Sequence, residues 1–255
     1  MNSELKKTGF SLAEVLLAIG TLAVGVLFVA GVFPVGIHLT TVAIERTIAA
    51  IAADEAFAKI KLYAKDDPGG SFNLGGLETN HLKDFNDVLM TKIDPCEFTY
   101  PSTDAPVEQK HYYWTALCRH IEGRLVQVTV FVCRKVSPNL KYYDPNDLER
   151  VDFVDWPRPV KIEVSAGNRN DEIVVDKTGT GSEPDERPFI NDGYTIVDDE
   201  TGRIYRVLER YASADDTILL DRNWEGSAEN VWVVPPPVGG GRRPCIGVYQ
   251  RVIRF

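Results

Sequence analysis

An uncharged stretch of 23 residues, 15–37, lies close to the N-terminus of the chain. A helix of that length extends ~35 Å, enough to cross the ~30 Å hydrocarbon core of a bilayer. The stretch is too long for the apolar region of an ordinary signal peptide, and an acid stands at its start. Lys6 and Lys7 precede it, and no Lys or Arg follows until Arg46, which places the N-terminus in the cytoplasm by the positive-inside rule. The sequence therefore predicts one transmembrane helix.

The acid at the start of this stretch is Glu14. It is the only charged residue in an otherwise uncharged run that begins at Phe10 and continues to residue 37. A carboxylate costs several kcal/mol at the centre of a bilayer and less near its surface, so an acid here indicates a functional role and a partner. The nearest candidate partner is the free amine at the N-terminus of a neighbouring subunit. That pairing requires a free amine close to Phe10, and therefore cleavage of the chain after Gly9.

The residues around Glu14 resemble the N-terminal segment of type IV pilins and pseudopilins. The resemblance covers residues 6 to about 37, with a basic leader, a Gly-Phe junction, a hydroxyl residue, an acid and then apolar residues (Lys6, Lys7, Gly9, Phe10, Ser11 and Glu14). In that family a prepilin peptidase cuts after the glycine, the new N-terminal phenylalanine is N-methylated, and the glutamate docks each subunit into the filament. The resemblance thus implies cleavage between Gly9 and Phe10, N-methylation of Phe10 and docking through Glu14, with Lys6 and Lys7 as the leader charge.

The resemblance also implies partners and a location. The partners are the prepilin peptidase, other pilin or pseudopilin subunits, an inner-membrane assembly platform and the lipid bilayer. The chain would cross the inner membrane once with its head in the periplasm, and then enter the filament of a type IV pilus or a type II secretion system. Pro34 lies three residues later than the proline of major pilins, which favours a minor pilin or pseudopilin.

The sequence predicts that the helix continues past the membrane. We expect a leader at 1–9, a transmembrane half at 10–37 and an amphipathic half at 38–66, which ends where Asp, Pro and Gly cluster. Eight alanines between positions 43 and 64 favour helix. Apolar residues at helical spacing predict a stripe that is buried against the head: Ile44, Ile48, Ile51, Ala58 and Leu62.

The rest of the chain predicts an α+β fold, in which the long helix packs on an antiparallel β-meander that a small all-β module follows. Two β-rich runs, 112–118 and 125–133, flank a Glu-Gly turn and predict a hairpin. The Tyr-x-Trp strand followed by a Val-rich strand also resembles minor pilins and pseudopilins of the I and V types. We assign 67–187 to this pilin-like head with long loops, weak helix near 81–90 and one further strand at 160–164.

Residues 188–255 predict the small all-β module. Short alternating strands, with turn signals between them, are expected at 194–197, 204–208, 217–220, 231–234 and 246–253. Five such strands favour a small barrel or a sandwich. The module is larger than a minimal pilin needs, so a particular function would lie there.

The four cysteines, Cys96, Cys118, Cys133 and Cys245, all follow the transmembrane segment. An even number in an oxidising compartment permits two disulfides with three connectivities, and buried free thiols are the alternative. Across the predicted hairpin Cys118 faces about Gln127 and Cys133 about Tyr112, which disfavours a bond between Cys118 and Cys133. A bond from Cys245 would tie the last strand to the first β-rich piece.

The sequence holds no catalytic motif and predicts neither an enzyme nor a cofactor or metal site. The acids Asp198, Asp199 and Glu200 lack the alternating spacing of a calcium loop, so a solvated turn is the simpler interpretation. The net charge of −9 argues against nucleic acid unless seven arginines share one face: Arg203, Arg206, Arg210, Arg242, Arg243, Arg251 and Arg254. The prediction is a minor pilin or pseudopilin; the alternative is a tip adhesin or DNA-uptake subunit that binds a ligand through residues 188–255.

Overall fold

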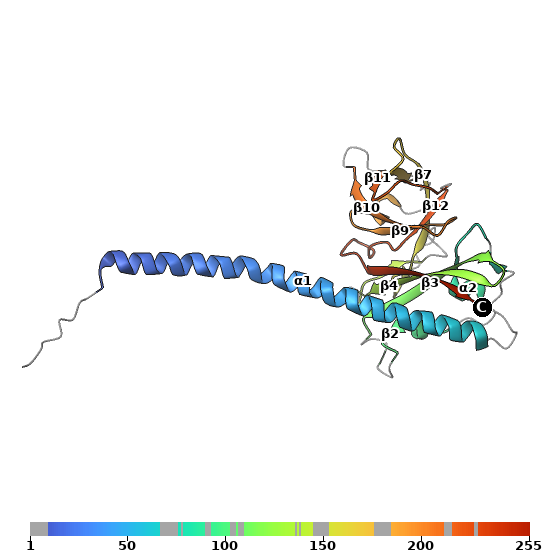
Figure 1. Cartoon of the computed structure of the whole chain (residues 1–255), viewed down its shortest axis with the longest axis horizontal. Coiled ribbons are helices and arrows are strands. Elements are labelled where there is room, and N and C mark those ends of the chain that lie inside the picture. The colour runs from blue at the N-terminus through green and yellow to red at the C-terminus, as the bar shows by residue number, and fades with distance from the viewer. Residues whose placement is uncertain are drawn as a thin grey trace, which may run out of the picture. The chain divides into compact units, whose positions relative to one another are not determined.

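A computed structural model of the 255-residue chain shows an α+β fold with one long helix and antiparallel sheets (Figure 1). The chain divides into two compact units, Met1–Thr47 and Ile48–Phe255. The structure describes residues 10–66, 76–77, 79–89, 93–102, 106, 110–135, 137, 139–144, 153–175, 185–211, 216–226 and 229–255.

Helix α1 (Leu12–Asp66) has 55 residues and runs through the boundary between the two units. This confirms the sequence prediction of one long helix that starts in the apolar stretch; the breaker residues 67–70 expected to end it lie outside the described residues. Pro34 lies inside the helix. Proline has no backbone N–H to donate and usually kinks a helix interior, but it is tolerated in apolar membrane-type helices, where local adjustments and neighbouring groups satisfy the freed carbonyl.

The part of α1 in the second unit packs on the sheet through its small residues. Its buried residues are Ala49, Ala52, Ala53, Ala56, Phe57, Ile60 and Ala64, in one cluster with residues of the sheet. The predicted buried stripe is therefore wrong, since Ile51 and Leu62 are 52% and 54% exposed. The sheet already supplies large side chains such as Trp114, and alanines let the helix backbone approach them closely.

A five-stranded antiparallel sheet carries this helix. Its strands are β1 (Lys83–Asp84), β3 (Tyr112–Glu122), β4 (Leu125–Arg134) and β13 (Cys245–Arg254), in that order, with β2 (Thr99–Tyr100) also paired with β3. The β3–β4 hairpin confirms the sequence prediction. Its register differs by one residue from the expected one, because the ladder shifts between His120 and Glu122, so that Cys118 lies opposite Val128.

The last strand departs from the prediction. Residues 246–253 were expected in the all-β module, but β13 pairs with β4 in the sheet that carries α1. That assignment is wrong. The alternation of apolar and polar residues in a strand indicates which of its faces is buried, but it does not indicate which strand lies next to it. The chain thus leaves this sheet after β4, builds a second body and returns to complete the sheet.

The second body is a closed six-stranded barrel in the order β10-β11-β8-β7-β12-β9. Its strands are β7 (Val160–Ala166), β8 (Glu172–Val175), β9 (Thr195–Asp198), β10 (Ile204–Arg210), β11 (Thr217–Leu220) and β12 (Asn230–Val233). The predicted strands at 194–197, 204–208, 217–220 and 231–234 are present, and β8 was missed. Residue 188, where the module was expected to begin, lies between β8 and β9. The interior is filled by apolar side chains, including Ile162, Ile196 and Tyr205.

Short elements complete the fold. They are α2 (Phe85–Val88), the two-stranded sheet of β5 (Tyr142–Tyr143) and β6 (Phe153–Val154), and the 3-10 helices η2 (Pro95–Phe98) and η4 (Arg187–Phe189). The helix expected near 81–90 is thus a single turn, α2, in which Asp84 caps the first residues by accepting a hydrogen bond from the Asn86 backbone N–H.

The barrel packs on the face of the sheet opposite α1 (Figure 1). Side chains of β4 alternate between the two faces: Val126 and its alternate neighbours join the cluster with α1, whereas Phe131 joins a cluster with barrel residues such as Val197. Polar contacts surround this second cluster. Gln250 Nε2 donates to the Gly202 carbonyl at 2.7 Å, and Gly202 has φ +68°, a conformation that favours glycine.

Asp199, in the turn after β9, is the buried acid that joins the barrel to the sheet. Its Oδ2 lies 2.7 Å from Lys161 Nζ and 2.9 Å from His81 Nδ1. Its Oδ1 accepts hydrogen bonds from Trp232 Nε1 at 2.6 Å and from the Leu82 backbone N–H at 3.2 Å. Lys161 and Trp232 belong to barrel strands, whereas residues 81–82 lead into β1, so one carboxylate bonds to both bodies.

We expect Asp199→Ala to lower the free energy of unfolding by about 3 kcal/mol, because it leaves Trp232 Nε1 and the Leu82 N–H without their acceptor and removes the acid that pairs with Lys161. Urea unfolding of the full chain in detergent, followed by tryptophan fluorescence, measures the change. The control is Glu200→Ala, one residue further on, which should change stability by less than about 0.5 kcal/mol. Equal stability of the two variants would contradict a structural role for Asp199.

Candidate functional site

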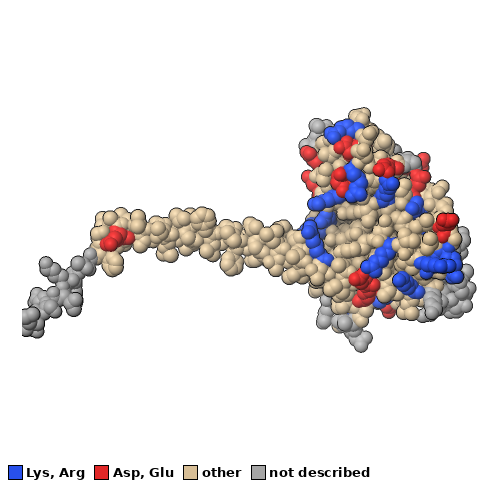
Figure 2. Space-filling model, in the orientation of Figure 1, with Lys and Arg blue, Asp and Glu red and all other residues tan. Residues whose placement is uncertain are grey.

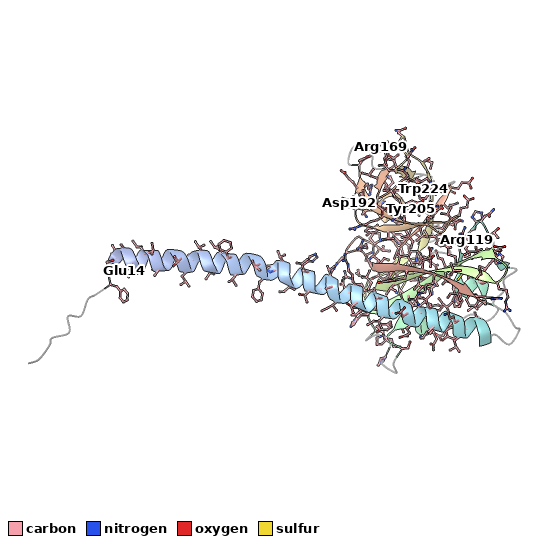
Figure 3. All side chains as sticks on the ribbon, in the orientation of Figure 1. Glu14, Arg119, Arg169, Asp192, Tyr205 and Trp224 are labelled. Atoms are coloured by element: carbon pink, nitrogen blue, oxygen red, sulfur yellow. The ribbon has the colours of Figure 1, made fainter. Side chains whose placement is uncertain are left out.

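The first turn of α1 is closed by two reciprocal hydrogen bonds between Ser11 and Glu14. The Ser11 backbone N–H donates to Glu14 Oε2 at 3.0 Å, and the Glu14 backbone N–H donates to Ser11 Oγ at 3.2 Å. The Ser11 carbonyl accepts from the Val15 N–H, which makes Ser11 the cap of the helix. This is the capping box formed by serine and by glutamate three residues later. Figure 3 labels Glu14 at this turn.

The geometry of this turn leaves part of Glu14 available. Oε2 accepts the Ser11 N–H, whereas Oε1 has no partner among the residues that the structure describes. The partial positive charge of the helix N-terminus also favours an acid here. Phe10 is 86% exposed. The other residues of the expected cleavage segment, Lys6, Lys7 and Gly9, lie outside the described residues.

The helix that follows is long and apolar enough to cross a membrane, and its most apolar 18-residue window is not buried against any other part of the chain. Leu16, Val24 and Phe28 are each more than half exposed. Residues 15–44 contain no Asp, Glu, Lys or Arg. Figure 2 shows this stretch of the helix in tan, after the red of the acid in its first turn. The surface is therefore apolar on all sides, as in a lipid-facing or bundle-forming helix.

The threonine hydroxyl groups of the helix have hydrogen-bond acceptors within it. Each of its four threonines donates to a carbonyl three or four residues earlier: Thr21 to Ala18, Thr40 to Gly36, Thr41 to Ile37 and Thr47 to Ala43, at 2.8–3.0 Å. In hydrocarbon no water is present to accept such a bond, so internal partners are what a membrane segment needs.

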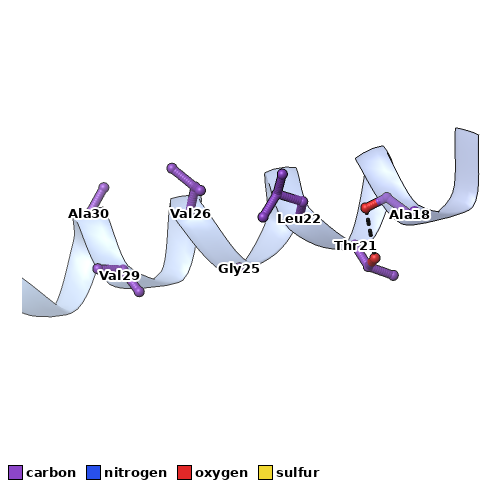
Figure 4. Close-up of a pocket in the computed structure, with 7 residues that line it drawn as sticks. All are labelled: Ala18, Thr21, Leu22, Gly25, Val26, Val29 and Ala30. Atoms are coloured by element: carbon purple, nitrogen blue, oxygen red, sulfur yellow. Dashed lines mark hydrogen bonds between the residues drawn. The ribbon is translucent and has the colours of Figure 1, made fainter. Parts of the chain in front are cut away.

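A shallow apolar groove follows one side of the helix (Figure 4). It is lined by small and medium-sized residues: Ala18, Thr21, Leu22, Gly25, Val26, Val29 and Ala30. At Gly25 a side chain would meet nothing within 4 Å, so the glycine is open to the surroundings. Small residues at such spacing let a second helix approach closely in membranes.

The four cysteines carry free thiols in this structure. Cys118 lies on the α1 face of the sheet, whereas Cys133 and Cys245 lie on the barrel face. A bond between Cys118 and Cys133 is disfavoured, as the sequence indicated, although the register that led to it was off by one residue. Cys96 is exposed in η2. Burial raises the pKa of the Cys118 thiol well above its usual value.

Two of the three acids considered for calcium bond to protein groups. Asp198 accepts hydrogen bonds from the backbone N–H and the hydroxyl of Thr201, and Asp199 pairs with Lys161 and His81. Among the described residues, no three His, Cys, Asp or Glu side chains are grouped so as to hold a metal ion. These acids therefore stabilise the turn after β9 and its contact with the sheet.

The seven arginines considered for nucleic acid come from three separate places: β10 with the residue before it, the turn before β13, and β13 itself. Arg203 pairs with Glu225, and Arg251 Nη2 lies 2.6 Å from Asp54 Oδ1. Over the barrel, Figure 2 shows acidic side chains between the basic ones. At least two of the seven positive charges are thus paired with acids of the same chain.

No protein-family model matches this sequence. No curated protein matches it in sequence. No solved structure matches its fold. The residues themselves and their geometry therefore carry the functional argument.

We expect Ser11→Ala to loosen the first turn of α1 by about 1 kcal/mol, because the Glu14 amide loses its acceptor. Amide hydrogen exchange of the full chain in detergent micelles measures this, and the rate at Glu14 should rise about fivefold. Ser11→Thr keeps the hydroxyl and should leave that rate unchanged. A rate in Ser11→Ala equal to that of the unmodified chain would show that the capping box does not hold the turn.

Proposed function

We propose that this chain is a minor pilin or pseudopilin, a structural subunit that enters a type IV pilus or a type II secretion pseudopilus through its N-terminal helix. The observation that carries the proposal is Glu14, an acid in the first turn of a helix that is otherwise apolar for thirty residues. The residues before it, with the Gly9-Phe10 junction and two lysines, supply the cleavage segment that such a subunit requires.

The capping box explains how Glu14 can serve both the single chain and the assembly. In the single chain the carboxylate is stabilised by the Ser11 N–H, which lowers the cost of holding an acid at the edge of the bilayer. Its second oxygen remains able to accept a neighbour's N-terminal amine. Cleavage before Phe10 would create such an amine one residue ahead of the cap, so each subunit offers a donor and an acceptor.

The apolar surface explains why the helix would move from lipid into a helical bundle. Lipid tails and neighbouring helices are both apolar, so the exchange needs close packing and polar pairing rather than hydrophobic burial. The groove at Ala18, Leu22, Gly25 and Val29 offers close packing, and Glu14 offers the polar pair. In the bundle, lipid headgroups and water no longer surround Glu14, and an unpaired carboxylate would be strongly unfavourable there. This favours the register between neighbouring helices in which Glu14 meets an N-terminal amine.

The proposal assigns partners and a location. The prepilin peptidase would cut the leader on the cytoplasmic face, and the chain would wait in the inner membrane with residues 48–255 in the periplasm. An inner-membrane assembly platform would then pass it to the other pilin or pseudopilin subunits. No step of this function needs catalysis by the chain itself.

The first experiment tests cleavage. The full chain, expressed with and without a prepilin peptidase, is purified from membranes and its intact mass is measured. We expect a peptidase-dependent start at Phe10 with one added methyl group, and no processing of Gly9→Val. The control is Gly20→Val, the same change in the apolar helix at a position with open space around it, which should be processed normally. A start at Met1 in every sample would contradict the family assignment.

The second experiment separates the charge of Glu14 from its capping role. Glutamine also forms a capping box, so Glu14→Gln keeps the first turn but cannot form an ion pair. We expect Glu14→Gln and Glu14→Ala to be cleaved normally and to enter sheared filaments about ten- to a hundredfold less than the unmodified chain, the worth of a hydrogen bond to a charged group. Incorporation of Glu14→Gln at the normal level would show that the cap, and not the charge, is what assembly uses.

A further inference from the structure

Two cysteines lie opposite each other where the barrel connects to the sheet. Cys133 stands near the end of β4 and Cys245 at the start of β13, and the two are partners in the antiparallel ladder. Opposite residues in such a ladder have Cα atoms about 4.5–5.5 Å apart, within the range of about 4.4–6.8 Å that a disulfide spans. Both side chains are buried in the same cluster on the barrel face. The backbone can therefore hold a bond between them.

The other two cysteines have no such alignment. Cys118 faces Val128 on one side and Lys83 on the other, and it belongs to the opposite face of the sheet. Cys96 is exposed in η2, outside the ladders. Of the pairings that four cysteines permit, the fold thus favours one bond, between Cys133 and Cys245, and leaves the remaining two as thiols.

We propose that Cys133 and Cys245 form a disulfide when the chain reaches an oxidising compartment, and that this bond closes the neck between the barrel and the sheet. The inference rests on the proposed function in one respect, the export of residues 48–255, which supplies the oxidant. The bond itself follows from the register of β4 and β13 and can be tested apart from any filament.

The neck consists of the two chain segments that leave and re-enter the sheet. The Arg134 backbone N–H donates to the Pro244 carbonyl at 2.9 Å, and the Val238 N–H donates to the Lys141 carbonyl at 2.9 Å. The whole barrel lies between the two cysteines along the chain. A cross-link that closes so long a loop removes much of the freedom of the unfolded chain, and it keeps β13 next to β4 even when their ladder opens.

The surroundings of the two thiols give them different roles. The hydrogen bond from Cys133 and the nearby charge of Arg243 lower the pKa of Cys245, whereas burial and the Cys245 sulfur raise the pKa of Cys133 well above its usual value. Both sulfurs are buried, so the exchange takes place when the first residues of β13 open. Arg243 stands two residues before Cys245 and stays close to that sulfur in the open chain, so Cys245 is the first nucleophile, since the thiolate is the form that attacks.

The exchange is balanced with a disulfide as the oxidant, either of a thiol-disulfide oxidoreductase or of glutathione. The Cys245 thiolate attacks one sulfur of the oxidant, forms a mixed disulfide and releases one thiolate. The Cys133 thiolate then attacks the Cys245 sulfur and releases the second. The two cysteines give up two protons and two electrons, and the oxidant's disulfide becomes two thiols.

The test is peptide mapping of the full chain in detergent, refolded with a mixture of reduced and oxidised glutathione and alkylated before digestion with trypsin. We expect one linked pair, residues 125–134 with residues 243–251, and alkylated thiols at Cys96 and Cys118. Recovery of both peptides separately, each with an alkylated cysteine, would overturn the proposal. So would a link between residues 125–134 and residues 111–119, which contain Cys118.

Two variants separate the bond from general effects of losing a thiol. Cys245→Ser should abolish the linked pair and leave Cys133 alkylated, whereas the matched Cys118→Ser should leave the linked pair intact. The oxidised chain should also populate the unfolded state about a thousandfold less than the reduced chain, and Cys245→Ser should show no difference between the two conditions. An equal urea midpoint for oxidised and reduced chain would overturn the role of the bond in closing the neck.

Alkylation of the chain inside cells that express it distinguishes this inference from the proposed function. A linked pair in those cells supports both the bond and the export of residues 48–255. If the chain forms the link with glutathione in detergent but is fully alkylated in cells, the pairing of Cys133 with Cys245 still holds. The export on which the proposed function depends would then be contradicted.

Discussion

The β3–β4 hairpin is buried on both faces, and the arrangement of residues 48–255 follows from that constraint. Strand β4 is apolar at nearly every position, as expected for a strand covered on both sides. One face accepts α1 through a row of alanines, and the other accepts the barrel through Phe131 and its neighbours. Two buried polar residues of β4, Gln127 and Thr129, lie on the barrel face, where both take part in hydrogen bonds around the turn at Gly202. Their polarity therefore serves the contact between the two bodies.

The sequence predicted the elements whose signals are local and failed where the answer depended on a distant partner. The β3–β4 hairpin and the β9–β10 hairpin each depend on turns and alternation within a few residues. The stripe through Ile51 and Leu62 was assigned to the core because it is apolar. The face of a helix that packs on a sheet, however, is the one whose side chains have the size that fits between the two backbones. Strand β13 was placed in the wrong sheet because its pattern is compatible with either, and β8 is only four residues long in a polar surrounding.

The candidate site was found from the sequence because a single acid in an apolar helix is unusual in itself. Its local partner was missed, although serine followed three residues later by glutamate is a readable signal for a capping box. An acid in a predicted membrane segment points to a partner on another chain, which draws attention away from the serine three residues before it. The structure adds that an acid in the first turn can be stabilised within its own helix and still present one oxygen outward.

Helix α1 has two parts, one exposed and apolar and one buried against the sheet, and the change between them occurs at Ala49. Ala49 is the first residue of the helix to be buried, directly after the boundary between the two units. From there to Ala64 the helix contributes small side chains to a core that β3, β4 and β13 enclose, so this part is stabilised by the fold itself. Before it, no described residue of the helix is buried, so the fold of residues 48–255 does not remove this apolar surface from the solvent. Because residues 49–64 pack on one face of the sheet and the barrel on the other, strand β4 supports both the helix and the barrel.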